Sequence, residues 1–465
     1  MNNDRPPFFK KFTRGYTFKV LLLVALVLLL LIPLNMIRGL VDDREHTANS
    51  AEADIMEAWG SQLVAAGPIV IIPGTRTEEI RTKTEKEGEK IELAKNPFTL
   101  AISPQKLNIE AAFKTETRKR GIFSVPLFSG TLRLSGAFDP APALSGLAAN
   151  EAVYLNQAEL VIALSSQKGI RKINTSTWDG EDLFFKPGNR GYSLFSGQGG
   201  SGRSRTGEGI GGIYAGISQF QNRAAAFDIS IEIRGGQYIR FLPVGQDTHA
   251  AVSADWGAPS FQGAYLPGES AVGDTDFSAL WDINYLSRDI PLFWKDYGER
   301  QTYSGSLFGV NFFRAVDAYA LNTRAVKYAV LFLTIPFLTL FLLEIFTKKR
   351  IHPAPYLLSG IANAVFYLLL LSLSEQIPFY TAYLIAALAV TAMMTLYSRS
   401  LLPSWNKSWY MGLTVSISYI LLYAVLNAQS YALLIGSIGT FVVLALIMFL
   451  TRKLDWYREE SESEK

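Results

Sequence analysis

The residues of this sequence that are best placed to do chemistry are polar groups inside apolar stretches of its last third. Residues 326–450 hold only eight Asp, Glu, Lys or Arg residues, and the unusual polar groups there are Glu344, Asn363, Glu375 and His352. A charged side chain at bilayer depth costs roughly a few kcal/mol, so such a group is usually functional or paired. We therefore take these four residues as the candidate functional or packing residues of the chain.

The position of each polar group within its stretch separates these two roles. Glu344 lies near the end of one stretch, beside Lys348, and Glu375 lies in a turn between two stretches. Both carboxylates can reach water or a partner, which favours an interfacial or helix-packing role over ion conduction. Asn363 lies nearer the middle of its stretch, where an amide most often hydrogen-bonds a neighbouring helix.

Two short motifs resemble parts of enzyme active sites. Ser103 with Lys106, and Ser165 with Lys168, have the serine–lysine spacing of penicillin-recognising enzymes. The S-D-N and K-T-G companions of that motif are missing, and the chain has no G-x-S-x-G nucleophile elbow. Chance matches explain both motifs, so the sequence predicts no catalytic residue here.

A glycine-rich stretch and two acidic pairs are the other tempting patterns. Residues 197–204 are one substitution short of a phosphate-binding loop, because Arg203 stands where lysine belongs, and neither a strand nor a helix flanks them. A flexible loop is favoured over nucleotide binding. The pairs Asp274/Asp276 and Glu181/Asp182 leave a periplasmic hydrolase open as a minor alternative.

The composition excludes several classes of protein. The chain has no cysteine, which rules out disulfides, cysteine-ligated metals and thiol nucleophiles. Its three histidines are scattered, so no local metal motif is formed. The formal net charge of +3 gives no sign of nucleic-acid binding. We expect no metal site, no cofactor and no enzyme activity.

Hydropathy places most of the C-terminal third in a membrane. Stretches of about 20 apolar residues cross a bilayer as helices. The sequence contains one such stretch near the N-terminus and five in the C-terminal third, so we expect six transmembrane helices. Their predicted ranges are 16–37, 326–346, 356–374, 379–398, 409–426 and 431–450. The first is interpreted as an uncleaved anchor rather than a signal peptide.

Positive charges in the short segments predict the orientation. The N-terminal tail holds five basic residues, and the expected inner segments carry Lys348, Arg399 and Arg452, whereas the turns 375–378 and 427–430 carry none. Cytoplasmic segments are enriched in Lys and Arg. We therefore expect a multi-pass protein of the bacterial inner membrane with both termini in the cytoplasm.

The predicted domains follow from this topology. Residues 1–37 form the cytoplasmic tail and first helix, 38–325 a periplasmic domain, 326–450 a five-helix bundle and 451–465 a second cytoplasmic tail. The fold class is an α+β membrane protein whose large, mainly antiparallel β domain is inserted between the first and second helices.

Alternation of apolar and polar residues predicts the strands of the inserted domain. The clearest run is Phe227, Ile229, Ile231 and Ile233. A helix is expected over 45–64, a solvated hairpin tip over 81–95 and a loop over 188–212. Further strands are expected at 69–72, 107–113, 132–134, 159–164, 238–242 and 277–285.

Three blocks of the sequence resemble the CreD family of bacterial inner-membrane proteins. They are Leu31–Arg44, Tyr319–Ala387, and Tyr431–Ser437 with Thr451–Tyr457. One departure is Pro355, where the family pattern has glutamine. The resemblance implies an inner-membrane protein tied to envelope integrity and stress response, without known catalytic residues or cofactor.

Three functions are carried forward from these observations. The favoured one is a non-enzymatic membrane protein whose periplasmic β domain binds an envelope protein, glycan or lipid. The alternatives are a transporter or a lipid- or ion-handling protein, for which Glu344 and Asn363 are the candidates, and a periplasmic hydrolase. The expected partners are the lipid bilayer and one envelope component, and no nucleic acid.

Overall fold

A computed structural model describes residues 16–84, 88–188, 211–296, 303–312, 318–347, 350–401, 405–428 and 431–452. The chain divides into two compact units. Residues 1–48 and 316–465 form the first, whose described part is helical, and residues 49–315 form the second, whose described part contains the end of the first helix, one short α-helix and mainly β-strands. The β-rich segment is therefore inserted between helical segments along the chain, as the sequence predicted.

The helical unit contains every predicted membrane span. Five of its helices, α2 and α4–α7, are long and apolar enough over their described residues to cross a membrane. The sixth, α8, has 20 residues and no charge. The helices are α2 (Tyr16–Trp59), α4 (Ala318–Thr347), α5 (Pro353–Ser374), α6 (Phe379–Leu401), α7 (Trp405–Asn427) and α8 (Ala432–Thr451).

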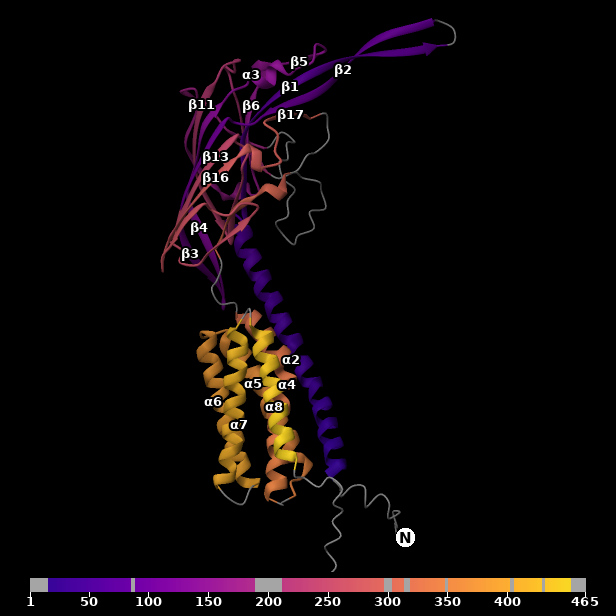
Figure 1. Cartoon of the computed structure of the whole chain (residues 1–465). Helices are drawn as coiled ribbons and strands as arrows, with labels where there is room; N and C mark the ends of the chain where they lie inside the picture. The colour runs from indigo at the N-terminus through magenta and orange to yellow at the C-terminus, as the bar shows by residue number, and fades with distance from the viewer. Residues whose placement is uncertain are drawn as a thin grey trace, which may run out of the picture. The chain divides into compact units, whose positions relative to one another are not determined.

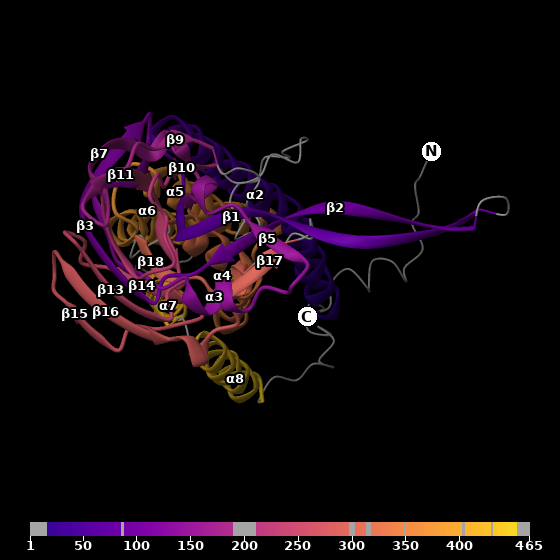
Figure 2. The ribbon, with the colours of Figure 1, turned by 90° about the horizontal axis from the view of Figure 1, so that it is seen from above.

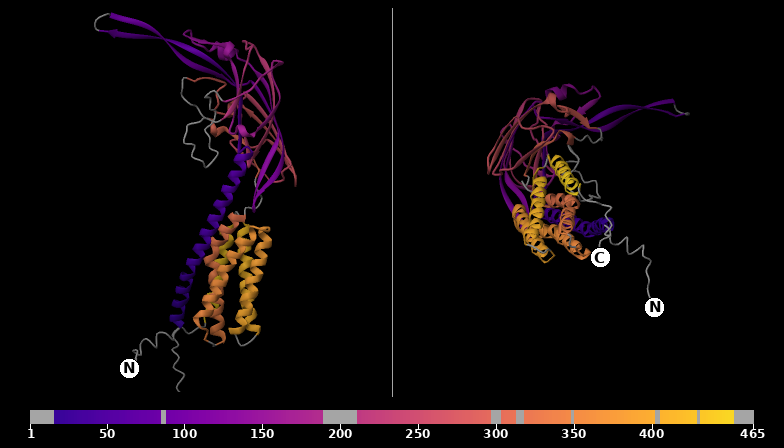
Figure 3. Two further views of the ribbon diagram at one scale, coloured as in Figure 1. Left: turned by 180° about the vertical axis from the view of Figure 1, so that it is seen from behind. Right: turned by 60° about the horizontal axis from the view of Figure 1, so that its bottom comes forward.

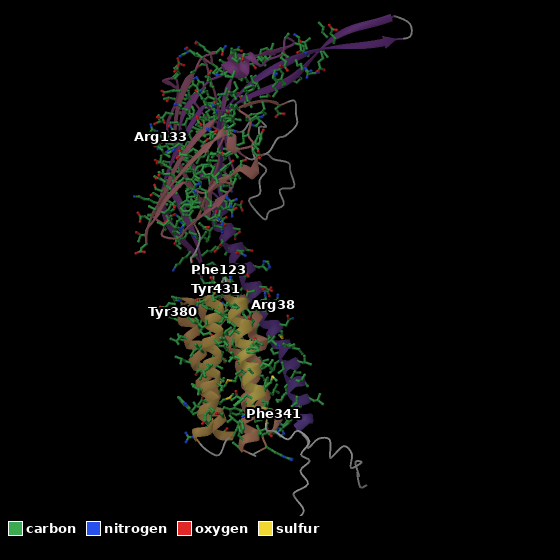
Figure 4. The ribbon with its side chains drawn as sticks, in the orientation of Figure 1. Arg38, Phe123, Arg133, Phe341, Tyr380 and Tyr431 are labelled. Carbon is green, nitrogen blue, oxygen red and sulfur yellow. The ribbon has the colours of Figure 1, made fainter. Side chains whose placement is uncertain are left out.

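Helices α4–α8 lie side by side as a bundle (Figures 1 and 3). In it α4 packs on α5 and α7, α6 packs on α5 and α7, and α8 packs on α7. Tyr380 and Tyr431 lie at one end, near Arg38 of α2, and Phe341 lies toward the other (Figure 4). Successive helices therefore alternate in direction, as short connections require.

Helix α2 corrects one prediction. The sequence suggested a second helix over 45–64, but a single helix runs from Tyr16 to Trp59, and strand β1 begins at Leu63. The helix continues through Pro33 and Gly39, which lie near the change from its apolar first half to its charged second half. The helix ends at Gly60, whose N–H donates to the carbonyl of Met56 at 2.9 Å. A Cβ at Gly60 would lie 2.5 Å from the carbonyl oxygen of Arg234, so only glycine fits.

A glycine also sets the packing of α2 on the bundle. Leu30 and Leu34 of α2 belong to the buried core of the bundle. A Cβ on Gly360 of α5 would meet Leu30 Cδ1 and would lie 2.7 Å from Phe337 Cζ. Without hydrophobic attraction between helices in lipid, such small residues allow the close contacts that hold helices together.

We expect Gly360→Leu to destabilise the helical unit by about 1–3 kcal/mol, because the added atoms overpack the contact between α2, α4 and α5. Gly360→Ala should cost less, since the atoms that it meets are the far ends of flexible side chains. Gly436→Leu is the matched control, because a Cβ there meets no atom within 4 Å. Thermal unfolding of the detergent-solubilised chain measures the difference, and equal midpoints for the two leucine variants would contradict it.

The β unit is made of two packed sheets. The first has the order β14-β18-β12-β1-β6-β10-β9, with β2 and β5 also on β1, and β17 on β2. Its strands are β1 (Leu63–Thr84), β2 (Gly88–Ile102), β5 (Glu151–Val153), β6 (Glu159–Leu164), β9 (Lys186–Pro187), β10 (Gly212–Gly216), β12 (Tyr238–Leu242), β14 (Pro259–Gly263), β17 (Phe293–Asp296) and β18 (Phe308–Phe312).

The second sheet has eight strands in the order β15-β16-β13-β3-β4-β11-β7-β8. They are β3 (Lys106–Arg120), β4 (Phe123–Phe138), β7 (Ile170–Trp178), β8 (Glu181–Asp182), β11 (Ala225–Gly236), β13 (Asp247–Ala254), β15 (Glu269–Val272) and β16 (Phe277–Asn284). Strand β3 alternates exposed and buried residues over its first half, so this sheet has one exposed face. Its inner face contributes Ile229, Ile231 and Trp281 to the common core.

The predicted strand pattern is confirmed. Strands β6 and β12 have the predicted bounds, and the other predicted strands lie within β1, β3, β4, β11 and β16, with Tyr285 just past the end of β16. Among the strand pairs of the described residues, only β1–β12 and β3–β13 are parallel. The domain is therefore mainly antiparallel, with two parallel pairs that periodicity alone does not indicate.

Strands β1 and β2 extend as a long hairpin from the rest of the β unit (Figures 1 and 2). They pair from Val70 with Ile102 out to Thr84 with Gly88. The expected hairpin over 81–95 is therefore present, with residues 85–87 outside the described part. Most of the glycine-rich loop predicted over 188–212, including residues 197–204, also lies outside the described residues.

Candidate functional site

Glu344 joins three helices at one end of the bundle. It lies near the end of α4 and is 5% exposed. Its carboxylate pairs with Nζ of Lys19 from α2 and accepts a 2.8 Å hydrogen bond from the hydroxyl of Tyr356 on α5. A buried carboxylate needs both charge pairing and hydrogen bonds to offset its desolvation, and Glu344 has both.

Glu375, directly after the last residue of α5, also contacts two other helices, α2 and α4. Arg44 of α2 donates two hydrogen bonds to its carboxylate, from Nε at 2.7 Å and from Nη2 at 2.8 Å. The hydroxyl of Tyr319 donates to the same carboxylate at 3.1 Å. A forked arginine–carboxylate pair fixes orientation as well as charge. Lys19 and Arg44 are 25 residues apart on α2, which is roughly 37 Å along a helix.

Asn363 of α5 makes hydrogen bonds to neighbouring helices in the middle of the bundle. It is 2% exposed, and its Nδ2 donates to the carbonyl of Phe332 on α4 at 3.0 Å. The hydroxyl of Tyr419 on α7 donates to Asn363 Oδ1 at 2.8 Å, and that of Tyr383 on α6 donates to the carbonyl of Tyr419 at 2.6 Å. Four helices are thus joined through neutral groups, with no carboxylate, lysine or histidine among them.

His352 has a local role and joins none of these clusters. Its Nδ1 accepts a 3.3 Å hydrogen bond from the N–H of Ala354, which makes it the N-cap of α5, and Pro353 follows at the first helical position. Both features start a helix. Of the four predicted residues, the structure therefore places three in helix-to-helix contacts and one at a helix start.

The sequence did not identify the partners of these residues. Lys19 stood out only as one of the five basic residues of the N-terminal tail, and Arg44, Tyr319 and Tyr356 only as members of the blocks that resemble the CreD family. The contacts of Lys19 with Glu344 and of Arg44 with Glu375 join residues 325 and 331 positions apart. No periodic pattern reports contacts over such separations.

The serine–lysine motifs of the β unit have structural contacts. Ser103 Oγ donates to the carbonyl of Pro291 at 3.3 Å, and Ser165 Oγ donates to that of Gln62 at 2.7 Å. Neither serine is bonded to the lysine of its motif in these contacts. Asp274 with Asp276, and Glu181 with Asp182, lie exposed on the surface. Within the described ranges no cluster of three His, Asp or Glu side chains could hold a metal.

An open cavity of about 850 Å³ lies where the β1–β2 hairpin leaves the sheet. Its lining includes Glu78, Glu79 and Glu151. Glu151 accepts a 2.5 Å contact from Nζ of Lys295, and Glu78 accepts a 3.0 Å hydrogen bond from Asn96. Two of the three carboxylates are therefore already bonded to the protein.

The exposed face of the eight-stranded sheet carries a forked ion pair. Arg133 of β4, labelled in Figure 4, donates from Nε and Nη2 to Asp228 of β11, both at 2.9 Å. The hydrogen bonds from Arg133 lower the pKa of the Asp228 carboxyl below its ordinary 3.8. This cross-strand pair strengthens the centre of the sheet.

We expect the Asp228 carboxyl to titrate below 3.8 and to return toward that value in Arg133→Gln. A carboxyl whose pKa is lower in the folded chain stabilises the fold above its unfolded pKa and loses that contribution as pH falls through the folded pKa. Carboxyl NMR titration checks the shift. Lys106→Gln is the control, because Lys106 is exposed on neighbouring β3, and an unchanged midpoint in Arg133→Gln would contradict the assignment.

Comparisons with known proteins agree with the membrane character of the chain. The family model described as "Inner membrane protein CreD" matches residues 15–457. The protein of that name from Escherichia coli (strain K12) is 28% identical over 440 residues, covering 95% of this chain and 93% of the relative. A crystal structure of an M1 zinc metallopeptidase from Deinococcus radiodurans, bound to a Tyr-Ser-Ala substrate, aligns at 9% identity over 45% of this chain and 42% of its own. Its TM-score of 0.22 supports no conclusion on fold or function.

Proposed function

The chain belongs to the CreD family of inner-membrane proteins, and from this we propose that it supports envelope integrity by binding an envelope component. The β unit would be the periplasmic binding part, and the helical bundle would anchor it and be coupled to it. The proposal is of a non-enzymatic protein, because the candidate catalytic motifs have structural contacts or lie exposed on the surface.

One observation carries the coupling part of this proposal: α2 is a single helix that is bonded within both units. In the helical unit it is held by the Lys19–Glu344 and Arg44–Glu375 pairs. In the β unit Asp54 pairs with Arg120 at 2.6 Å, and the Trp59 ring lies 3.7 Å from the guanidinium carbon of Arg118. We propose that a displacement of one unit is passed to the other through this helix.

The spacing of the two ion pairs supports a membrane position for the first half of α2. Their separation of roughly 37 Å along the helix is similar to the thickness of a bilayer with part of its headgroups. Both carboxylates would then lie at the interfaces, with Asn363 between them. This arrangement favours anchoring over transport, since the three groups are used in contacts between helices.

Fusions to alkaline phosphatase test the orientation. We propose that both termini are cytoplasmic and that the β unit is periplasmic. A fusion near residue 200 should then be active, and fusions at 350, 404 and 460 should be inactive. The reverse pattern would overturn the topology.

A helix-breaking substitution tests the function. Ala51 lies on α2 beyond Arg44, and proline there costs about 3 kcal/mol of helix stability. In cells lacking the native gene, the full chain should restore resistance to detergent with EDTA. Ala51→Pro should fail to do so at equal membrane abundance, whereas Ala51→Leu should succeed. Full protection by Ala51→Pro would exclude coupling through α2, and unchanged resistance in the deletion strain would exclude the envelope role.

A further inference from the structure

The eight-stranded sheet has two free strand edges. At one end β15 pairs only with β16, and all four of its residues are exposed. At the other end β8 covers only Thr177 and Trp178 of β7. Residues 170–175 of β7 therefore have no strand partner on their outer side among the described residues. Free edges present unpaired backbone N–H and C=O groups that can pair with another chain.

The two edges carry opposite charge. Residues 265–287 around β15 contain Glu269, Asp274, Asp276 and Asp282 but no lysine or arginine. Residues 166–178 around β7 instead contain three basic residues and no acid: Lys168, Arg171 and Lys172. Such complementarity steers association and selects its register.

We propose that the β15 edge of one copy pairs with the β7 edge of a second copy, so that the sheet continues from chain to chain. Each edge is thus paired with the opposite edge of another copy of the same protein. This contact is independent of the envelope component in the function proposed above.

The strand directions of the sheet fix the direction of this pairing. Every neighbouring pair from β15 to β7 is antiparallel except β13 and β3. Strands β15 and β7 therefore run in opposite directions within one sheet. A second copy that continues the sheet in the same orientation brings its β7 antiparallel to β15, and two copies in one membrane share that orientation.

The charges select the same direction. Antiparallel pairing brings the acidic turn after β15, with Asp274 and Asp276, to the basic start of β7, with Lys168 and Arg171. Parallel pairing would place that turn beside Glu181 and Asp182 of β8 instead. The four residues of β15 also fit within residues 170–175, the free part of β7 before β8 begins.

The contact joins different surfaces of the two copies, so it does not close on itself as a twofold dimer does. Each pair leaves one free β15 edge and one free β7 edge. The expected assembly is therefore an open row or a ring of copies, and it should weaken as salt screens the charges.

Because the chain has no cysteine, disulfide trapping tests this proposal directly. Ala271 of β15 and Lys172 of β7 lie on the outer face of the sheet and are exposed. Opposite residues of paired strands have Cβ atoms about 4.5–5.5 Å apart, close to disulfide geometry. Full-length Ala271→Cys and Lys172→Cys chains with different tags would be produced together, and their membranes oxidised with copper phenanthroline.

We expect a mixed disulfide dimer when both chains are present and no dimer from either chain alone. Thr175→Cys replaces Lys172→Cys in a second pair, to cover a register shifted toward β8. Ala271→Cys with Ser135→Cys is the matched control, because Ser135 lies on the same face at the centre of the sheet. We expect cysteine at these positions on the outer face of the sheet to leave folding intact. Equal membrane abundance of each variant and the unsubstituted chain checks this.

Charge reversal provides a second measurement. Asp274→Lys with Asp276→Lys on the Ala271→Cys chain should lower the yield of mixed dimer by about tenfold or more. Lys168→Asp with Arg171→Asp on the Lys172→Cys chain should restore it. Dimers from Ala271→Cys alone would overturn the proposal, and so would an equal yield from the Ser135 control. Absence of any mixed dimer would also overturn it.

Discussion

Replacing Arg288 by leucine is expected to destabilise the β unit by about 3–5 kcal/mol, a large part of the stability of a typical domain. Arg288 is 8% exposed and holds together two segments of chain. Its Nε donates to the carbonyl of Gly245 at 3.1 Å, its Nη2 to that of Val244 at 3.0 Å, and its Nη1 to that of Ile290. Leucine would leave three carbonyls without these donors.

The charge of Arg288 is kept at neutral pH. Burial lowers its pKa to about 10, so the guanidinium still donates as a cation at pH 7. Arg288→Lys would retain the charge but not the planar fork that reaches three acceptors. We expect this variant to recover part of the lost stability and Arg288→Leu none of it.

Pulse proteolysis of the full chain in detergent measures this effect through the fraction of intact β unit at rising urea. Arg223→Leu is the matched control, because Arg223 pairs with Asp179 at the surface with 59% of its side chain exposed. A surface pair of this kind contributes less than about 1 kcal/mol. Equal urea midpoints for Arg288→Leu and Arg223→Leu would show that the three carbonyls find other donors.

The strands of the β unit were predictable because their signal is local. Alternating residues such as Phe227, Ile229 and Ile231 report directly which face of a strand is buried. The same signal does not report which strands are neighbours. The parallel pairing of β3 with β13 joins segments about 140 residues apart, from Lys106 with Asp247 to Phe113 with Ala254.

The length of α2 was mispredicted for a physical reason. Its first half is apolar and its second half is charged, so hydropathy changes near Arg38 although the backbone does not. The change from apolar to charged residues indicates only where the chain leaves the lipid, and not where the helix ends. Helix ends are marked by caps and glycines instead, and the relevant glycine was Gly60.

Glu344→Leu is expected to destabilise the helical unit by about 2–3 kcal/mol. The substitution removes the partner of Lys19, whose side chain is 21% exposed, and the acceptor for Tyr356, which is 1% exposed. Because Lys19 reaches the surface in part, its ammonium group can recover some hydration, so the loss is smaller than for a fully buried pair. Thermal unfolding of the solubilised chain measures it, with Lys327→Met, at an exposed position on the same bundle, as the control.

A double-mutant cycle separates the ion pair from simple packing. If the cost of Glu344→Leu comes from stranding the Lys19 ammonium, then Lys19→Met in the same chain should recover at least about half of it, because no charge is left without a partner. Tyr356→Phe alone should cost about 1 kcal/mol, the value of one hydrogen bond. A double variant that is as unstable as the sum of its single variants would assign Glu344 to packing alone. Recovery in the double variant would identify the Lys19–Glu344 pair as the bond that fixes α2 at this end of the bundle, which is the mechanical connection that coupling through α2 requires.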